Sequence, residues 1–124
     1  VVSNKQGPYL RKEVEKLGWK GYFRAVVGAT DAVRDKPDPA PVRLALEPLN
    51  LEPGPHIWFV GDSITDMACA ANSALTGVLI RELPPEPEEF SAAMPAFTGP
   101  DCHALTEILT KHVIPGFTTA NAVR

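Results

Sequence analysis

The chain has 124 residues, of which 44% are apolar and 22% are charged. This length and composition are typical of one soluble globular domain, which buries roughly two-thirds of its unfolded surface. The formal net charge is −3 and the basic residues are scattered, so no basic patch predicts a nucleic-acid or acidic-membrane partner. No apolar run approaches the ~20 residues that span a bilayer, and none follows a basic start as in a signal peptide.

The two cysteines and three histidines do not form a recognisable metal or disulfide pattern. Cys69 and Cys102 are far apart and outside any CxxC motif, and no histidine has metal-ligand spacing with them. A disulfide framework or a zinc site is therefore not expected. The simplest compartment for such a chain is a reducing cytoplasm.

Apolar periodicity and turn residues predict strands and helices that alternate along the chain. The first two residues are typical of the end of a β-branched strand, with residues 3–5 as the loop that leaves it. The expected helices cover residues 9–17, 41–49, 64–74 and 101–112, and Pro48 is expected to weaken the last turn of the second. The expected strands cover residues 23–28, 57–60 and 78–80. Residues 83–89 are rich in Pro and Glu, and residues 113–124 are expected to form a tail.

This alternation predicts an α/β fold with a parallel sheet and helices on both faces. In such folds, ligands bind outside the carboxyl ends of the strands. Polar residues follow three of the expected strands: Ser3 after the first, Lys36 in the loop after the second, and Asp62 after the third. All three positions should therefore lie along one edge of the sheet.

Each of these residues, taken alone, has an ordinary structural explanation. Ser3 is typical of a turn or a helix cap, and Lys36 is typical of a solvated loop. Asp62 fits the N-cap of the next helix, with Asp66 as a favourable charge in its first turn. A single cap does not require two carboxylates directly after a buried strand, however, because buried carboxylates need a compensating partner.

Taken together, the stretches VVSNK, the lysine of DKPDP, and FVGDSITDM resemble motifs two to four of the haloacid dehalogenase-like hydrolase superfamily. The resemblance spans about residues 1–80 and is strongest to the phosphoglycolate phosphatase-type branch. It implies a Rossmann-like core whose first central strand and cap are missing here. It also implies a Mg²⁺-dependent phosphatase that acts on a small phosphorylated metabolite.

The resemblance assigns a role to each motif residue. Asp62 is expected to be the direct metal ligand, and Asp66 to face the same ion through water or to orient the ligand. Lys36 is expected to hold the substrate phosphate and the nucleophilic carboxylate together. The Ser3 hydroxyl and the Asn4 backbone N–H are expected to donate hydrogen bonds to a phosphoryl oxygen. The side chains of Asn4 and Lys5 are expected to be structural.

The family's nucleophile, an Asp-x-Asp after an apolar strand, is not found in these 124 residues. We therefore expect residues 1–112 to be the C-terminal part of a core domain from a longer phosphatase, and the chain alone to be inactive. The family's first strand lies between those that end near Ser3 and Asp62. Its absence leaves a gap of roughly 10 Å, so either the flanking strands pair or two edges remain exposed.

Three other interpretations remain open at this stage. A dehalogenase of the same fold is disfavoured because displacing halide from carbon needs no pair of metal-binding acids. A non-catalytic phosphate- or metal-binding module would retain the same residues without turnover. A Rossmann-like domain with a coincidental motif is the third. The sequence does not identify the substrate or the oligomeric state.

Overall fold

The computed structural model describes residues 1–112 as an α/β fold with two parallel sheets. The strands are β1 (Val2–Gln6), β2 (Val27–Ala29), β3 (Trp58–Gly61), β4 (Thr76–Ile80) and β5 (Phe97–Gly99). The helices are α1 (Gly7–Lys16), α2 (Ala40–Leu46), α3 (Ile64–Asn72) and α4 (Cys102–His112), with short 3-10 turns at Lys20–Tyr22 and Glu47–Leu49. The tail expected at residues 113–124 lies outside the described residues.

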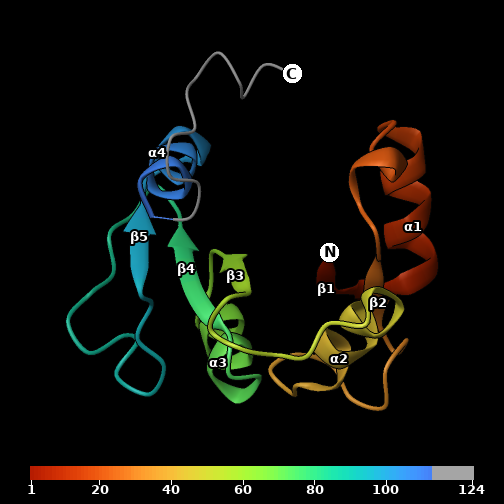
Figure 1. Cartoon of the computed structure of the whole chain (residues 1–124), viewed down its shortest axis with the longest axis horizontal. Helices are drawn as coiled ribbons and strands as arrows, with labels where there is room; N and C mark the ends of the chain where they lie inside the picture. Colours follow the sequence, from red (N-terminus) through yellow and green to blue (C-terminus); the bar gives the residue numbers. More distant parts are fainter. Residues whose placement is uncertain (113–124) are drawn as a thin grey trace.

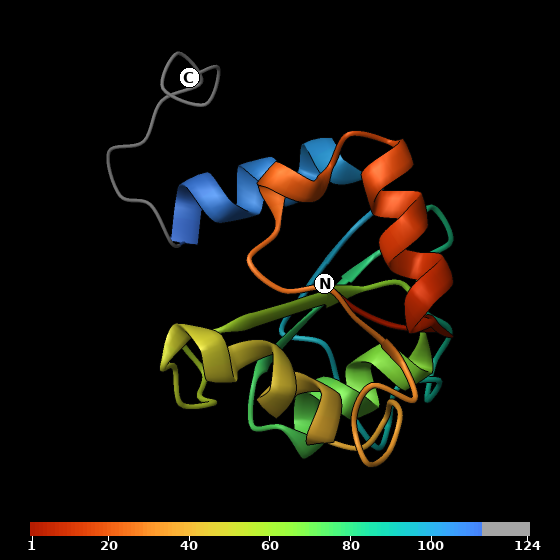
Figure 2. The ribbon, with the colours of Figure 1, turned by 90° about the vertical axis from the view of Figure 1, so that its right-hand side faces the viewer.

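The elements form three layers, with the strands in the middle (Figure 2). Helices α1 and α4 lie on one face of the strands, and α2 and α3 lie on the other. One sheet contains β1 and β2, and the other contains β3, β4 and β5 in that order, all parallel (Figure 1). The α/β class with helices on both faces is therefore confirmed. Among the described residues β1 and β3 do not pair with each other, so each keeps one exposed edge, which is the second of the two outcomes expected above.

The apolar core lies mainly beneath the three-stranded sheet. Met67 of α3, Leu79 of β4 and Phe90 of the following loop form one buried cluster. That loop is fixed by Arg81, whose guanidinium binds both carboxylate oxygens of Glu89 at 2.6 and 2.9 Å and lies 5.2 Å from the centre of the Phe90 ring. The end of the Pro-rich segment is therefore anchored to the sheet at Glu89 and Phe90, while residues 83–88 stay exposed.

Two strand predictions were wrong. Residues 3–5 were expected to form a loop but belong to β1, because β1 pairs with β2 from Val2 to Gln6 despite its polar sequence. Strand β5 was not predicted at all, since three residues after a Pro-rich loop give little alternation to detect. The strand expected at residues 23–28 is shorter, with only Val27–Ala29 in the ladder.

The expected helices are all present, with ends shifted by a few residues. The second ends as a 3-10 turn at Glu47–Leu49, which contains Pro48, as the weakened last turn predicted. No helix within residues 1–112 is long and apolar enough to cross a membrane.

Gly28 allows β2 to approach the start of α1 closely. A Cβ atom at Gly28 would lie 2.4 Å from the Gly7 Cα and 2.6 Å from the Lys5 carbonyl oxygen, both of them backbone atoms that cannot rotate away. We expect Gly28→Ala to lower the free energy of unfolding by about 2 kcal/mol, the scale of overpacking in a tight contact. Urea denaturation followed by circular dichroism measures the change.

Gly21→Ala is the matched control, because nothing lies within 4 Å of a Cβ atom at that position. Its urea midpoint should stay close to that of the parent chain. Equal midpoints for the two variants would show that β2 does not pack on α1 as described.

Candidate functional site

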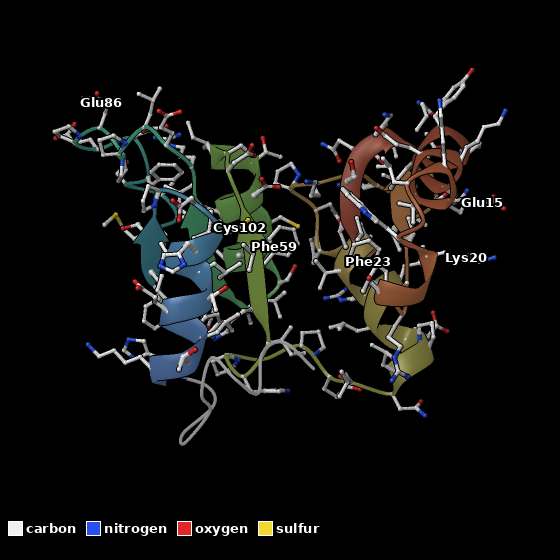
Figure 3. The ribbon with its side chains drawn as sticks, turned by 90° about the horizontal axis from the view of Figure 1, so that it is seen from above. Glu15, Lys20, Phe23, Phe59, Glu86 and Cys102 are labelled. Carbon is white, nitrogen blue, oxygen red and sulfur yellow. The ribbon has the colours of Figure 1, made fainter. Side chains whose placement is uncertain are left out.

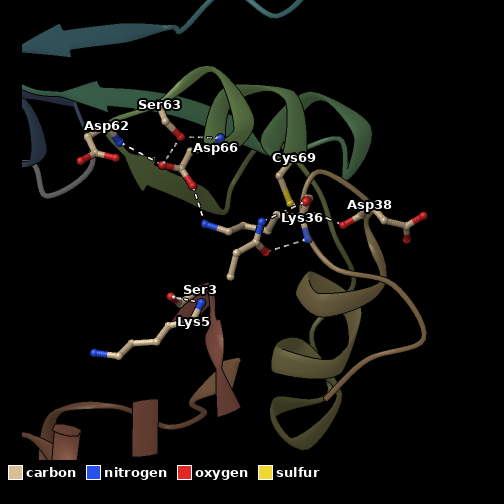
Figure 4. Close-up of polar contacts among 9 residues, drawn as sticks. Ser3, Lys5, Lys36, Asp38, Asp62, Ser63, Asp66 and Cys69 are labelled. Carbon is tan, nitrogen blue, oxygen red and sulfur yellow. Dashed lines mark hydrogen bonds and ion pairs between the residues drawn. The ribbon is translucent and has the colours of Figure 1, made fainter. Parts of the chain in front are cut away.

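The candidate site lies between β1 and the carboxyl end of β3, where the three sequence motifs approach one another (Figure 4). Lys36 comes from the long loop after β2, while Asp62, Ser63 and Asp66 come from the turn between β3 and α3. The loop and the turn belong to different sheets. The site therefore bridges the two halves of the molecule.

The Lys36 loop is held from both sides by hydrogen bonds to its backbone. The Asn4 side chain of β1 binds it twice, donating to the Lys36 carbonyl oxygen and accepting from the Lys36 N–H, each at 3.1 Å. On the other side, Asn72 of α3 donates to the Pro37 carbonyl oxygen at 2.9 Å. The Lys36–Pro37 peptide bond is cis. These contacts fix the backbone from which the Lys36 side chain extends.

Lys36 and Asp66 form a largely buried ion pair across the two sheets. The Lys36 Nζ donates to the Asp66 Oδ1 at 2.6 Å, and the two side chains are only 11% and 9% exposed. The ammonium also lies 5.9 Å from the centre of the Phe59 ring, in the range of a cation–π contact. Each charge is stabilised by the other, because either one alone would be buried without enough water to solvate it.

The second oxygen of Asp66 is also fully engaged. Its Oδ2 accepts hydrogen bonds from the Ser63 hydroxyl at 2.9 Å and from the Asp62 N–H at 3.1 Å. Burial on its own raises the pKa of Asp66, but the ion pair with Lys36 and these two donors outweigh it and hold the pKa below its usual value. Asp66 is therefore an ionised group that organises the turn and Lys36 together.

Gly61 lets the end of β3 pass directly beside this carboxylate. A Cβ atom at Gly61 would lie 2.4 Å from three side-chain atoms of Asp66. Any larger residue would thus displace Asp66 from its partners. The close approach explains why a glycine precedes the first carboxylate.

Asp62 differs from Asp66 in both exposure and bonding. Its side chain is exposed, and it makes no hydrogen bond or ion pair to any residue in the described part of the chain. Ser63, not Asp62, caps α3, because the Ser63 Oγ accepts from the Asp66 N–H at 3.2 Å. The capping explanation considered for Asp62 is therefore wrong, whereas Asp66 does lie in the first turn.

Ser3 lies on β1, across the site from the carboxylates (Figure 4). Its Oγ accepts a hydrogen bond from the Lys5 N–H at 3.1 Å, which leaves its own proton available to a ligand. Lys5 itself pairs with Glu13 of α1. Within residues 1–112, no hydrogen bond joins Ser3 to Lys36 or to either carboxylate.

Sequence reasoning missed the residues that position the site rather than the residues that carry charge. Ser63 and Asp66 form an S-x-x-D capping pattern that is present in the sequence, but the interpretation of Asp62 and Asp66 as metal ligands did not take it into account. The side chain of Asn4 was expected to be structural, and it does bind the Lys36 backbone. Nothing in the sequence indicated Asn72 as an anchor of the loop.

The family comparison agrees with this geometry. The family described as "Haloacid dehalogenase-like hydrolase" matches residues 1–80, which include every motif residue of the site. The chain belongs to the haloacid dehalogenase-like hydrolase family. Its described structure resembles that of a HAD-superfamily hydrolase from Ehrlichia chaffeensis, with a TM-score of 0.73 and 28% identity over 87% of this chain and 47% of that one.

The chain is also similar to proteins named phosphoglycolate phosphatase. It is 39% identical to the one from Pectobacterium atrosepticum over 70 residues, which cover 56% of this chain and 30% of the relative. It is 36% identical to the one from Escherichia coli K12 over 70 residues, which cover 56% of this chain and 27% of the relative. The matched segment thus spans less than a third of the length of these relatives.

Asp66→Asn tests the ion pair through its dependence on pH. Because the folded-state pKa of Asp66 is lowered, its stabilising effect is complete above about pH 4, the usual value for a carboxyl, and disappears as the pH falls through the folded-state value. We expect the variant to be less stable than the parent chain by about 3 kcal/mol at pH 7, the lower end of the range for a buried pair that loses one partner. Urea denaturation at pH 7 and at pH 3 measures both values, and the difference should shrink at pH 3.

Glu82→Gln is the control, because Glu82 is exposed and its side chain forms no hydrogen bond or ion pair among the described residues. It should leave stability unchanged at both pH values. A loss in Asp66→Asn that is equally large at pH 3 would mean that packing, not the charge pair, stabilises this region.

Proposed function

We propose that this chain is part of a Mg²⁺-dependent phosphatase that hydrolyses a small phosphorylated metabolite. The observation that supports the proposal most strongly is the Lys36–Asp66 pair beside the free carboxylate of Asp62, at the carboxyl ends of parallel strands. Membership of the haloacid dehalogenase-like hydrolase family adds to it. The likeness to proteins named phosphoglycolate phosphatase makes a phosphoglycolate-like substrate the first one to test.

The donor set is compatible with Mg²⁺ but does not make a complete site. Mg²⁺ is held by one or two carboxylates and otherwise by water and substrate oxygens. Asp62 offers one unengaged carboxylate, whereas both oxygens of Asp66 already accept hydrogen bonds. Residues 1–112 contain no cluster of three or more acidic, His or Cys side chains suited to a metal. Asp62 would thus hold the ion, and Asp66 would position the turn and Lys36. When bound, the ion would supply positive charge opposite the phosphoryl oxygens.

The remaining residues would bind and orient the phosphoryl group. Lys36 presents its ammonium at the same edge, where it would offset the repulsion between a phosphate and an attacking carboxylate. The Ser3 hydroxyl and the Asn4 backbone N–H would donate to a phosphoryl oxygen from the opposite side. Phosphoryl transfer needs little more than such positioning and charge neutralisation.

The nucleophile would be an aspartate outside these 124 residues. Its carboxylate oxygen would attack phosphorus as the bond to the substrate oxygen breaks, and that leaving oxygen would take up a proton from a general acid that also lies outside these 124 residues. Water would then hydrolyse the aspartyl-phosphate and release inorganic phosphate. On this proposal the chain alone does not turn over substrate, and the longer protein does.

The function is tested in the longer protein with phosphoglycolate and a panel of other small phosphomonoesters. We expect turnover with added Mg²⁺ and its loss in EDTA. Undiminished phosphoester turnover in EDTA would overturn the assigned Mg²⁺ dependence, and turnover of a haloacid but of no phosphoester would favour the dehalogenase interpretation. If calorimetric titration shows that Mg²⁺ binds but no ester is turned over, the result would instead support a non-catalytic binding module.

Asp62→Asn and Lys36→Ala in the longer protein test the assigned roles. We expect each to reduce kcat/KM by about 100-fold or more, the scale of removing one preorganised electrostatic contact. Asp62→Asn should in addition raise the Mg²⁺ concentration needed for half-maximal activity. Steady-state kinetics across a Mg²⁺ series measures both effects.

Glu82→Gln and Lys20→Ala serve as charge-matched controls, since both residues are exposed and lie outside the site. They should keep the parent turnover and Mg²⁺ dependence. If Asp62→Asn kept the parent activity, another group would have to hold the metal.

A further inference from the structure

Arg81 is a basic residue close to Asp62 to which the proposed function gives no role. Strands β3 and β4 are parallel neighbours, and Gly61 at the end of β3 lies opposite Leu79 of β4. Asp62 is the residue after β3, and Arg81 is the residue after β4. Because paired strands lie about 4.8 Å apart, both residues leave the same end of the sheet from adjacent positions. Figure 3 shows the loop after β4, which carries Glu86, at the end of the sheet where β3 turns into α3.

The charges of Arg81 and Asp62 act on each other, yet their side chains form no ion pair in the described part of the chain. The pKa of Arg81 is raised, first by its hydrogen bonds to Glu89 and then, against the opposing effect of burial, by the charges of Glu89 and Asp62. An unpaired carboxylate attracts a nearby guanidinium, since the two can form a bidentate, charge-assisted pair. A competing contact must therefore hold Arg81 in another direction.

The guanidinium of Arg81 is directed into its own loop. Its Nε donates to the Leu83 carbonyl oxygen at 2.8 Å, and its two Nη atoms donate to the carboxylate oxygens of Glu89 at 2.9 and 2.6 Å. One Nη also donates to the Pro84 carbonyl oxygen at 3.5 Å. The ring of Phe90 lies 5.2 Å away on one face of the guanidinium. All three guanidinium nitrogens are thus engaged within the loop.

Glu89 is the charged partner that sets this direction. Its two oxygens face the two Nη atoms side by side, a fork that fixes the plane of the guanidinium as well as its position. One of these oxygens also accepts from the Glu86 N–H at 3.0 Å. The hydrogen bonds from Arg81 and from the Glu86 N–H lower the pKa of Glu89, so Glu89 stays ionised. The carbonyl groups that also contact Arg81 carry no net charge and hold a cation less firmly than a carboxylate does.

Without Glu89, Arg81 would compete with a metal ion for Asp62. Asp62 is exposed, and its side chain makes no hydrogen bond or ion pair to another described residue. A bidentate pair with arginine uses both oxygens of a carboxylate. Mg²⁺ binds through carboxylate oxygens and demands a nearly octahedral arrangement around it. The same carboxylate therefore cannot serve the guanidinium and the ion together.

We propose that Glu89 is a positioning residue for the proposed metal site: it holds the Arg81 guanidinium in the loop after β4 and so leaves the Asp62 carboxylate free to bind Mg²⁺. This inference rests on the proposed function, in which Asp62 holds the ion. Glu89 acts only through Arg81, so its effect on the metal must vanish when Arg81 is absent. A pair that served only to close the loop would show no such dependence.

A double-mutant cycle on stability tests the position of Arg81 without any metal. Urea denaturation of the intact chain in EDTA gives the folding equilibrium constant of the parent, Asp62→Asn, Glu89→Gln and the variant that combines them. In Glu89→Gln, Arg81 turns to Asp62. We therefore expect Asp62→Asn to lower the folding constant about five-fold more in this background than in the parent, the upper end of what an exposed ion pair contributes. Equal effects in the two backgrounds would overturn the proposal.

Calorimetric titration of Mg²⁺ into the longer protein tests the effect on the metal. Glu89→Gln should raise the dissociation constant about five-fold, because the ion must displace Arg81 from Asp62. Arg81→Gln combined with Glu89→Gln should return the constant to the parent value or lower, since no guanidinium remains to compete. A constant that is unchanged in Glu89→Gln, or that is not restored by the second substitution, would overturn the proposal.

Glu82→Gln is the matched control for both measurements. It removes the same charge from the same loop, but the Glu82 side chain forms no hydrogen bond or ion pair among the described residues. It should show no coupling to Asp62→Asn and should keep the parent dissociation constant. Glu89→Asp gives the same two tests if Glu89→Gln does not fold, as judged by circular dichroism, because it draws the carboxylate one methylene away from the guanidinium.

The two measurements also separate this inference from the proposed function. If the longer parent protein bound no Mg²⁺, the proposed function would be overturned, and the cycle in EDTA would still show whether Glu89 holds Arg81 away from Asp62. If the parent bound Mg²⁺ but the cycle showed no coupling, the proposed function would stand and this inference would be wrong.

Discussion

The ion pair between Lys36 and Asp66 joins two sheets that share no backbone ladder. Lys36 extends from the loop that follows β2, and Asp66 lies on the helix that follows β3. The pair is largely buried, so neither charge can be left without the other at small cost. The Asp66 carboxylate also orders the turn at the end of β3, through Ser63 and the Asp62 N–H. One carboxylate thus sets both the position of the lysine and the direction in which Asp62 points.

The backbone contacts around the loop make this pair specific rather than adaptable. A lysine side chain is flexible, and on a free loop it would sample many positions. Here Asn4 binds the Lys36 backbone from β1, and Asn72 binds Pro37 from α3, so the loop is tied to both halves before the side chain makes its contact. The ammonium group of Lys36 is therefore restricted to a narrow range of positions beside the carboxyl end of β3. Preorganisation of this kind is what stabilisation of a charged reacting group requires.

The sequence predicted the elements that have strong local patterns and missed those that depend on distant partners. Helix α1 and strand β3 follow from apolar spacing and from their flanking glycines, and both lie within a few residues of their predicted positions. The polar half of β1 is a strand only because β2 lies beside it, and no local propensity in Asn-Lys-Gln indicates this. The expectation that Ser3, Lys36 and Asp62 share an edge rested on parallel topology, and the loop of Lys36 does reach the turn of Asp62. The reciprocal bonds of Asn4 with Lys36 join residues 32 positions apart, a separation at which periodicity carries no information.

The same contacts account for an open cleft of about 350 Å³ between the two sheets, which is lined by apolar residues of β1, α2 and β3. Two unpaired strand edges lined by apolar side chains would ordinarily close on each other, since pairing satisfies the backbone and removes apolar surface from water. Closing would bring β1 toward β3, but Asn4 on β1 is bound to the Lys36 loop, and that loop is bound to α3. Because α3 packs on β3, these bonds hold β1 and β3 at a separation set by the loop. The polar bridge at the carboxyl end of β3 therefore keeps the apolar cleft open, so residues proposed to bind phosphate also fix the separation of the two sheets.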